Sequence, residues 1–323
     1  MKFKKIIKLP IVFIPADIVF SILSLPSLLW LRLCKFINIS KLPCTKKILY
    51  RIGVFPLVDH YYEPLFRFDR LRLDGKPRNL NINWNENRQF EYFNKFDYLE
   101  ELKAIPEEGN LNSLNYYFNN EAYSGFDAEY LYSMIRLIKP KRIIEIGSGF
   151  STRMMLKSVS INKLENPTLN TIITCIEPYE MPWLENIGVE VIRKRAEEVP
   201  LNLFESLQEN DILFIDSSHM IRPEGDVLHE IFNIFPVLNK GVIIHIHDIF
   251  SPFDYPSDWL LKENRMWNEQ YLVEAFLMHN TDYDIIGALA YIGSRHPELA
   301  KKHFPYSYKK NWLSGSALWL QKK

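Results

Sequence analysis

The sequence predicts an α/β fold in which a doubly wound, mostly parallel sheet is covered by helices on both faces. Three observations lead to this class. From about residue 127 onward, helical and strand-like segments alternate; the strand-like runs are apolar toward both faces; and a Gly-x-Gly turn follows the first run. Because helices cover both faces of a parallel sheet, its strands bury nearly all their side chains and read as continuous apolar runs.

Five runs predict the parallel strands of this sheet. They are RIIEIG (142–147), TIITCIE (171–177), VEVIR (189–193), DILFID (211–216) and GVIIHIH (241–247). Two later runs, YDIIGALAYIG (283–293) and SALWLQK (316–322), are separated by a long loop. We expect them to close the sheet as an antiparallel pair.

Helices are expected before and between these strands. The segment ahead of the first strand has apolar residues at helical spacing and ends at Pro140. Its predicted buried face consists of Leu131, Met134, Ile135 and Ile138. A further helix is expected to begin near Ser151, directly after the glycine turn, and another to cover about 224–235.

Differences in composition and periodicity divide the chain into three parts. Residues 1–52 form a basic, apolar segment, residues 53–123 an extension rich in aromatic and Asn residues, and residues 124–323 the regular α/β domain. The middle part has little periodicity. Irregular segments of this kind often cover binding sites, so we interpret it as a cap.

The first part indicates contact with a membrane surface. Ten Lys or Arg residues fall within residues 1–51 against one acid, Asp17, and they flank an apolar stretch at 9–31. Its longest uncharged run, 18–31, is shorter than the ~20 residues that a transmembrane helix needs. We expect a helix or helical hairpin in the membrane interface, or else a helix packed on its own domain or on a dimer partner. Prolines are expected to break the helical pattern, namely Pro10, Pro15 and Pro26.

Charge and cysteine content narrow the class of protein. Ten bases and one acid give residues 1–51 a charge of +9, so in a chain of zero net charge the remainder carries −9. This argues against a nucleic-acid-binding core. Cys34, Cys44 and Cys175 are odd in number and lack C-x-x-C spacing, which favours a reducing compartment. We expect a cytoplasmic protein, peripheral on the inner face of the membrane, and leave its oligomeric state open, a homo-oligomer included.

The turn after the first strand is the candidate cofactor site. Gly147, Ser148 and Gly149 let the backbone pass close to a ligand, and the helix opening near Ser151 presents its N-terminal amides. A dinucleotide fingerprint would have a third glycine at position 152, where this chain has Thr.

Two acids at strand ends indicate which cofactor the glycine turn would bind. Glu145 precedes the glycine turn, and a carboxylate there suits the cationic methionine portion of S-adenosylmethionine better than a diphosphate. Glu177 ends the second strand, where an α/β nucleotide site places the acid that accepts the ribose hydroxyls. The alternative is a tight turn with an incidental acid.

These segments resemble the class I S-adenosylmethionine-dependent methyltransferases. The motifs are E-I-G-S-G-F-S-T, C-I-E-P, F-I-D-S-S-H and H-D-I-F. Their residues are similar to those of the bacterial branch that includes relatives of macrocin O-methyltransferase and cephalosporin hydroxylase. The resemblance covers roughly 123–323, and the segment GVFPLVDHYYEPLF (53–66) resembles uncharacterised members with the same extension.

The resemblance implies a seven-stranded Rossmann-like sheet and S-adenosylmethionine as cofactor. It implies cofactor contacts along the carboxyl edge of the sheet by Glu145, Gly147, Ser148, Gly149, Ser151, Glu177, Ala196 and Asp216. Ala196 would reach the adenine edge, although a solvated surface turn explains that segment equally well. Some relatives carry two adjacent acids after the fifth strand, where this chain has His247-Asp248.

The fourth and fifth strands deliver the candidate catalytic residues to one edge of the sheet, namely Asp216, His219, His247 and Asp248. In one interpretation Asp216, His247 and Asp248 bind a divalent cation, Mg²⁺ or Mn²⁺, which holds the acceptor and lowers the pKa of its hydroxyl. In another, His219 or His247 is a metal-free general base oriented by an Asp. A purely structural role is the third, and His245 is expected to support rather than to react.

The predicted function is O-methylation of a glycan, a lipid-linked sugar or a secondary-metabolite hydroxyl. Loop residues 250–259, 267–271 and the aromatic region before Ser124 are expected to form the acceptor pocket, because aromatic rings stack on the C–H faces of sugars. The same aromatic residues could instead pack the cap onto the core. Two rival hypotheses are an NAD(P)-dependent oxidoreductase and a non-catalytic membrane-bound module that keeps the fold.

Overall fold

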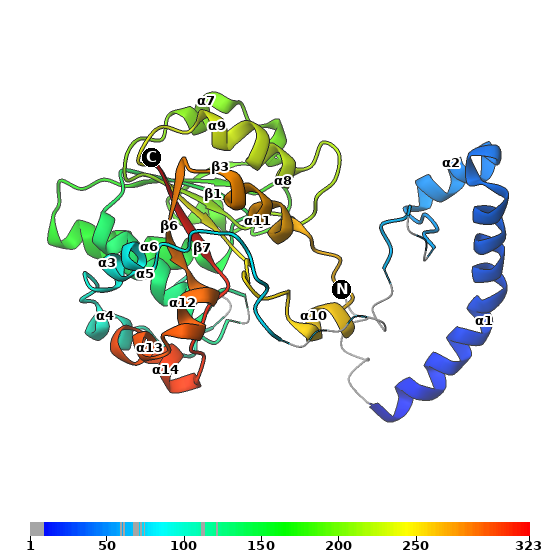
Figure 1. Ribbon diagram of the computed structural model, residues 1–323, viewed down its shortest axis with the longest axis horizontal. Helices are drawn as coiled ribbons and strands as arrows, with labels where there is room; N and C mark the ends of the chain where they lie inside the picture. Colours follow the sequence, from blue (N-terminus) through cyan, green and yellow to red (C-terminus); the bar gives the residue numbers. More distant parts are fainter. Residues whose placement is uncertain are drawn as a thin grey trace. The chain divides into compact units, whose positions relative to one another are not determined.

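The computed structural model describes residues 10–58, 60, 62–66, 71, 73, 75–110, 114–120 and 122–323, which Figure 1 draws in colour. The chain forms two compact units, Met1–Arg72 and Leu73–Lys323. The predicted division at residues 52 and 123 stays a prediction. Part of the predicted basic flank lies outside the described residues, namely Lys2, Lys4, Lys5 and Lys8.

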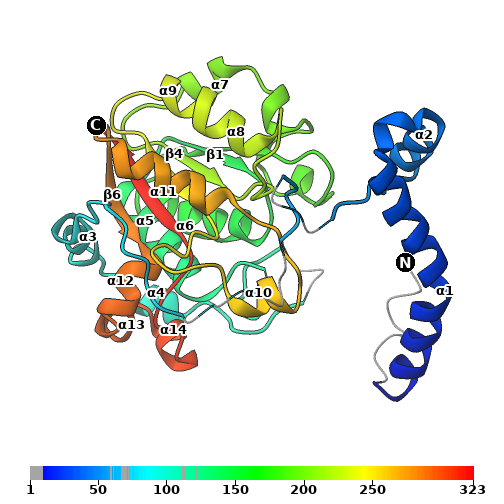
Figure 2. The same cartoon turned by 45° about the vertical axis from the view of Figure 1, so that its right-hand side comes forward.

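The first unit consists of a long helix, a short turn and a second helix. Helix α1 (Pro10–Ile37) is continuous (Figure 2), and η2 (Ile39–Lys41) and α2 (Pro43–Ile52) follow it. Pro15 and Pro26 lie inside α1, so the prediction that prolines interrupt the helical pattern is wrong. Proline fixes φ near a helical value, and its cost is confined to the amide donor it removes and the carbonyl it crowds.

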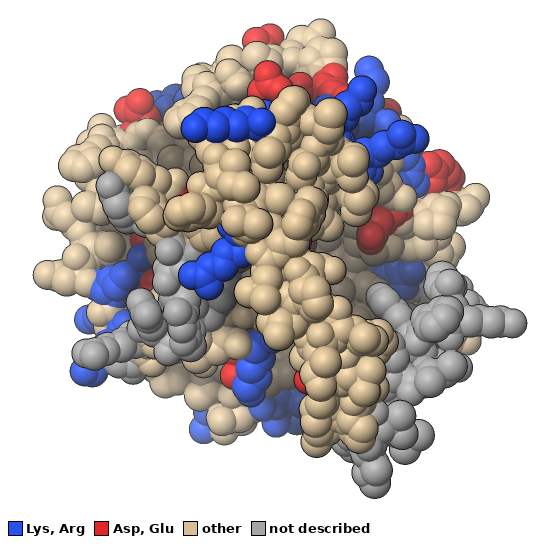
Figure 3. All heavy atoms as spheres, turned by 90° about the vertical axis from the view of Figure 1, so that its right-hand side faces the viewer, with Lys and Arg blue, Asp and Glu red and all other residues tan. Residues whose placement is uncertain are grey.

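The length of α1 bears on whether the apolar segment is long enough to span a membrane. Ile14–Ile37 is one helix of 24 residues with a mean hydropathy of 1.7, and none of its most apolar window is buried. At 1.5 Å per residue this stretch measures about 36 Å, enough to cross a bilayer core of about 30 Å. Figure 3 turns the right-hand side of Figure 1 toward the viewer, and the face seen there is largely tan, that is, free of Lys, Arg, Asp and Glu. Length and composition alone support this statement, and an N-terminal signal sequence would meet the same criterion.

The second unit is built on a seven-stranded sheet with the order β3-β2-β1-β4-β5-β7-β6. The first five strands are parallel, and β7 runs antiparallel to both β5 and β6. This confirms the predicted doubly wound sheet with a terminal antiparallel pair. The strands are β1 (Arg142–Ile146), β2 (Ile172–Ile176), β3 (Glu190–Ile192), β4 (Ile212–Ile215), β5 (Ile243–Ile246), β6 (Tyr283–Ala288) and β7 (Leu318–Lys322).

Alternate residues of each central strand point into two separate apolar cores. In β4, Ile212 and Phe214 face one core, and Leu213 and Ile215 face the other. Both cores are closed by helices, so a strand such as β4 has no solvent face and can be apolar throughout. Figure 1 shows the two helical layers on opposite sides of the sheet.

The helices of the two layers have the following bounds. One layer contains α3 (Glu86–Phe93), α4 (Leu99–Lys103), α5 (Gly125–Ile138), α6 (Phe150–Glu165), α12 (Leu289–Arg295), α13 (Glu298–His303) and α14 (Pro305–Lys310). The other contains α7 (Leu201–Glu205), α8 (Asp226–His229), the π-helix η6 (Glu230–Ile234), α9 (Phe235–Val237) and α11 (Glu269–His279). Short helices lie in the connecting loops, namely η4 (Leu184–Asn186), η5 (Ala196–Glu198) and α10 (Ser257–Leu261).

Three details differ from the predicted elements. The run 283–293 is not one strand, because β6 ends at Ala288 and α12 begins at Leu289. The expected long loop before β7 consists largely of α12, α13 and α14. The predicted helix at 224–235 is present but changes to π geometry over Glu230–Ile234.

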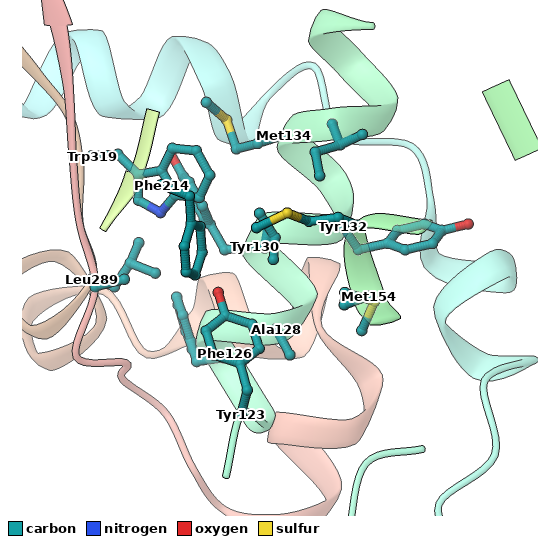
Figure 4. Close-up of a cluster of buried hydrophobic side chains, with 14 of the residues drawn as sticks. Tyr123, Phe126, Ala128, Tyr130, Tyr132, Met134, Met154, Phe214, Leu289 and Trp319 are labelled. Atoms are coloured by element: carbon teal, nitrogen blue, oxygen red, sulfur yellow. The ribbon is translucent and has the colours of Figure 1, made fainter. Parts of the chain in front are cut away.

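Aromatic residues of the predicted cap belong to the core of the second unit. Phe93 of α3 is fully buried, and its ring lies 5.4 Å from that of Tyr130 of α5 and 5.9 Å from that of Phe304. Tyr130 also packs against Trp319 of β7, at 5.5 Å between centroids (Figure 4). The aromatic composition of this segment therefore reflects packing around α5.

We expect Phe93→Ala to destabilise the second unit by about 3–5 kcal/mol, the usual cost of removing a buried aromatic ring. Leu164→Ala is the matched control, because Leu164 on α6 is 81% exposed and its loss should change the free energy of unfolding by less than about 0.5 kcal/mol. Urea unfolding of the full chain measures both. Equal stabilities of the two variants would contradict the assignment of α3 to the core.

Candidate active site

The carboxyl ends of the parallel strands open into a cavity of about 1080 Å³. This donor cavity, as we call it from here on, is bounded by the turns after β1, β2, β3 and β4 and by residues of α8 and η6. Ligands of doubly wound folds bind at this edge. Four of the predicted site residues line the cavity: Gly147, Glu177, Ala196 and Asp216.

The turn after β1 is fixed by a close backbone contact. Gly147 has φ +77°, and a Cβ atom at this position would lie 1.9 Å from the carbonyl oxygen of Asp216. Its amide donates to Ile176 at 3.0 Å, and the Asp216 amide donates to Ile146 at 2.9 Å. Only glycine fits here, because both the backbone angle and the contact exclude a side chain.

Glu145 lies beneath this turn and holds it. Its side chain is fully buried, and its two oxygens accept hydrogen bonds from the hydroxyls of Ser151 at 2.7 Å and Thr152 at 2.6 Å. Burial raises the pKa of Glu145 to about 7, against the lowering effect of these hydrogen bonds. The two oxygens of Glu145 thus fix the first turn of α6, and its expected contact with a cofactor stays a prediction.

The other predicted residues of the turn are also set back from the donor cavity. Ser148, Gly149 and Ser151 are absent from its described lining. Gly149 has an extended backbone and donates its amide to the Thr152 hydroxyl at 3.1 Å. Thr152, at the position of the missing third glycine, therefore anchors the turn.

Glu177 is positioned by the loop that follows β2. One carboxylate oxygen accepts the amides of Tyr179 and Glu180, each at 2.9 Å, and the other lies 3.4 Å from the amide nitrogen of Ser148. The carboxylate thus spans the turns after β1 and β2 at the wall of the donor cavity. Ala196, at the start of η5, lines the same cavity beyond β3.

Three predicted catalytic residues converge after β4 and β5. The Nε2 atom of His219 lies 3.3 Å from Oδ1 of Asp216 and 3.7 Å from Oδ2 of Asp248. One candidate ligand atom from each of these residues falls within 4.8 Å of the others. Among the described residues, the set that could hold a metal ion is therefore Asp216, His219 and Asp248. It shares both aspartates with the predicted set, and the role of His247 as the imidazole ligand stays a prediction.

The reason for this difference lies in backbone conformation. His219 and Asp248 have φ values of +58° and +56°, in the left-handed region that side chains rarely adopt. Such conformations cost about 1–3 kcal/mol each and persist where surrounding contacts enforce them. The left-handed turn at His219 accompanies a ring directed toward the β5 edge, which strand periodicity cannot predict.

A segment from the other helical layer holds His219. Its Nδ1 atom lies 2.9 Å from Oε2 of Glu269, the amides of Asn268 and Glu269 donate to its carbonyl, and its ring packs on Trp267 at 4.2 Å between centroids. Burial lowers the pKa of His219, but Asp216 and Glu269 outweigh it and raise the pKa to about 11. Residues 267–269 thus position His219, and their expected part in an acceptor pocket stays a prediction.

His247 and His245 occupy different surroundings. The Nε2 atom of His247 is 3.7 Å from Oδ1 of Asp248; burial lowers the pKa of His247, but Asp248, Asp216 and Asp127 together raise it. His245 is fully buried, stacks on Phe214 at 4.0 Å, and its pKa is lowered well below the usual range by burial. His245 is a core residue, as expected from its supporting role.

The structure adds polar residues that the sequence did not single out. Glu230, at the start of the π-helix, is buried and accepts a hydrogen bond from the Ser217 hydroxyl at 3.2 Å. Burial, and to a lesser extent the negative charges of Glu269 and Asp226, raise the pKa of Glu230 well above the usual range. Asp226 accepts the Ser218 amide at 2.9 Å. Single acids in helices carry no motif, so only the three-dimensional packing identifies them.

Comparison with known proteins agrees with this geometry. A family described as a methyltransferase domain matches residues 144–249, which include the glycine turn and the convergent residues. An uncharacterized protein of Archaeoglobus fulgidus is 31% identical over 177 residues, 49% of this chain and 76% of that protein. The chain belongs to the class I S-adenosylmethionine-dependent methyltransferases. This supports the enzyme over the oxidoreductase and the non-catalytic module.

Solved structures with some likeness to this methyltransferase include MycE, from the mycinamycin biosynthetic pathway. Its complex with Mg, SAH and mycinamycin VI is 16% identical, with a TM-score of 0.36, and the match covers 71% of this chain and 55% of MycE. The chain thus spans about half the length of MycE. A putative protein-L-isoaspartate O-methyltransferase of Plasmodium falciparum, in complex with S-adenosyl-L-homocysteine, is 16% identical, with a TM-score of 0.27, over 50% of this chain and 77% of that one.

We expect Gly147→Ala to abolish cofactor binding, because the added methyl group would collide with the backbone of Asp216. Gly188→Ala is the matched control: Gly188 also has a positive φ, +80°, but no atom lies within 4 Å of its added Cβ. Calorimetry with S-adenosylhomocysteine should give micromolar affinity for the wild type and the control, and at least a 100-fold loss for Gly147→Ala. NAD should bind to none of them, and tight NAD binding would contradict the cofactor assignment.

Proposed function

We propose that this methyltransferase transfers a methyl group from S-adenosylmethionine to a hydroxyl of a glycan, a lipid-linked sugar or a related secondary metabolite. The observation that carries the proposal is the convergence of Asp216, His219 and Asp248 at the donor cavity. Membership of the macrocin O-methyltransferase branch is part of the proposal and rests on the motifs at 145–152 and 214–219.

The convergent residues fit a divalent cation. Asp216 and Asp248 offer carboxylate oxygens, and His219 offers Nε2 while Glu269 lies at hydrogen-bond distance from its other nitrogen. Histidine ligands of metals commonly donate their second N–H to a carboxylate, which fixes the ring and its tautomer. A bound Mg²⁺ or Mn²⁺ would supply charge that favours the deprotonated form of an acceptor hydroxyl.

The protein's own side chains would position the acceptor hydroxyl relative to the methyl donor. Asp216 lies on the wall of the donor cavity and His219 between the two aspartates, so an acceptor oxygen held there would lie next to the donor. A sulfonium is a good leaving group, and alignment of the two reactants supplies much of the rate. In the metal-free alternative both nitrogens of His219 are engaged by carboxylates, which leaves His247 as the candidate base.

We expect Mn²⁺ to bind the full chain through His219 and not through His247. Electron paramagnetic resonance of free Mn²⁺ should show binding at least tenfold weaker for His219→Ala, and binding within about threefold of wild type for His247→Ala. Glu269→Gln should weaken it by about 10–100-fold, the usual effect of removing a carboxylate that orients a histidine ligand.

Activity provides the second measurement of the same proposal. Methyl transfer to a hydroxyl acceptor should stop with EDTA and return when Mg²⁺ or Mn²⁺ is added. Full activity in EDTA, or Mn²⁺ binding that depends on His247 alone, would contradict the metal assignment and favour the metal-free base.

The proposal places the enzyme at the cytoplasmic face of a membrane. Helix α2 combines Lys46, Lys47 and Arg51 with exposed apolar side chains, of which Ile48 is 58% and Ile52 67% exposed. Cations beside exposed apolar residues suit a surface of anionic lipid headgroups. The exposed apolar side chains of α1 would supply the apolar contact.

We expect the full chain to bind vesicles that contain phosphatidylserine more tightly than vesicles of phosphatidylcholine alone. Reversing Lys46, Lys47 and Arg51 to Glu should remove this preference, because each basic residue near such a surface contributes about 1 kcal/mol. Lys157, Lys163 and Lys301 reversed to Glu form the matched control and should keep the preference. Vesicle flotation measures this, and an unchanged preference in the first variant would refute the role of α2.

A further inference from the structure

A second cavity lies beside the reacting residues. It has a volume of about 410 Å³ and lies between the start of α5, the loop after β5, the start of α12 and the segment that leads into β7. We call it the acceptor pocket, since we propose that it binds the ring that carries the methylated hydroxyl. This inference rests on the proposed function and adds to it a site and a chemical class.

A short series of contacts connects the acceptor pocket to the donor cavity. Ser316 lines the pocket, and its hydroxyl oxygen lies 3.2 Å from Oδ1 of Asp248. Asp248 lies 3.7 Å from Nε2 of His219, and the same nitrogen lies 3.3 Å from Asp216, which lines the donor cavity. A hydroxyl that binds beside Ser316 would therefore lie next to Asp248, which His219 connects to Asp216 at the donor cavity.

The wall between α5 and β7 is built by close contacts. Asp127 accepts the amides of Ser316 and Ala317, with Oδ1 at 2.9 Å from each nitrogen. A Cβ at Gly315 would lie 2.3 Å from that same Oδ1, so only glycine lets the segment approach. These contacts hold the Ser316 hydroxyl in place without help from a ligand.

One side of the pocket is an aromatic surface. Gly125 has φ +60°, and a Cβ there would lie 2.7 Å from the ring of Trp312, so the indole packs directly on the backbone at the start of α5. Three further rings line the pocket, namely Phe126, Phe250 and Phe253. The C–H faces of a sugar ring pack favourably against such surfaces.

The polar groups of the pocket define the charge of its ligand. Hydroxyls come from Ser124, Ser314 and Ser316, and the charged residues of the described lining are both acids, Asp127 and Asp254. Arg78 lies 3.5 Å from Asp254 but is outside the lining and also pairs with Glu274. Because carboxylates repel anions and accept hydroxyl donors, the pocket suits an uncharged, hydroxylated ring and disfavours a ring that carries phosphate.

The experiment uses the full chain with Mg²⁺ and S-adenosylmethionine labelled in its methyl group. The probes are phenyl glycosides of glucose, galactose and mannose, and the 6-phosphates of the same sugars. We expect label in at least one neutral glycoside and at least tenfold less in every sugar phosphate. A chain that binds S-adenosylhomocysteine but labels no neutral glycoside, or prefers the phosphates, would overturn the proposal.

Variants assign the effect to the acceptor pocket. Ser314→Trp fills it and Trp312→Ala removes part of its aromatic surface; each should lower kcat/KM for the glycoside at least tenfold while the affinity for S-adenosylhomocysteine and the Tm stay unchanged. Ser160→Trp, at an exposed position on α6 outside both cavities, is the matched control. Unchanged kcat/KM in both pocket variants would overturn the proposal. If the wild-type chain fails to bind S-adenosylhomocysteine, the result would instead refute the proposed function.

Discussion

The contact between the Gly147 turn and the backbone of Asp216 is the constraint on which the rest of the site depends. It joins the carboxyl ends of β1 and β4 with no room for a side chain between them. The turn can then be anchored from below by Glu145, through the hydroxyls of Ser151 and Thr152. The donor cavity opens beside this junction, with Asp216 on its wall. One backbone contact therefore sets both the shape of the cavity and the position of the Asp216 carboxylate on its wall.

The second half of the site depends on contacts between layers. His219 follows β4, but its orientation is fixed by Trp267, Asn268 and Glu269 at the start of α11. Asp248 follows β5, and it is met by Ser316 from the segment before β7. His219 and Asp248 are thus each held by a part of the chain that lies about 50 to 70 positions further along. Left-handed backbone at both residues is the cost of this arrangement.

The sequence predicted those features that follow from periodicity and from glycine chemistry. Continuous apolar runs identified the parallel strands, because both faces of the sheet are buried. The glycine turn located Gly147, and the strand ends brought Asp216, Glu177 and Asp248 to one edge. Periodicity could not select His219 over His247, since the choice depends on a left-handed turn and on Glu269. The expectation from proline also failed at α1, where the helix continues through Pro15 and Pro26, because proline's φ is itself compatible with a helix.

The place of β7 in the sheet has a consequence for synthesis. This strand is translated after the other six, yet it lies between β5 and β6 and pairs with both. A nascent chain that has emerged only as far as β6 can form the five parallel strands but has no partner for β6. Domains generally fold as units during synthesis. The sheet is therefore completed, with Trp319 against His245 and Ser316 beside Asp248, only after residues 316–319 have been synthesised, so a shorter nascent chain lacks these contacts.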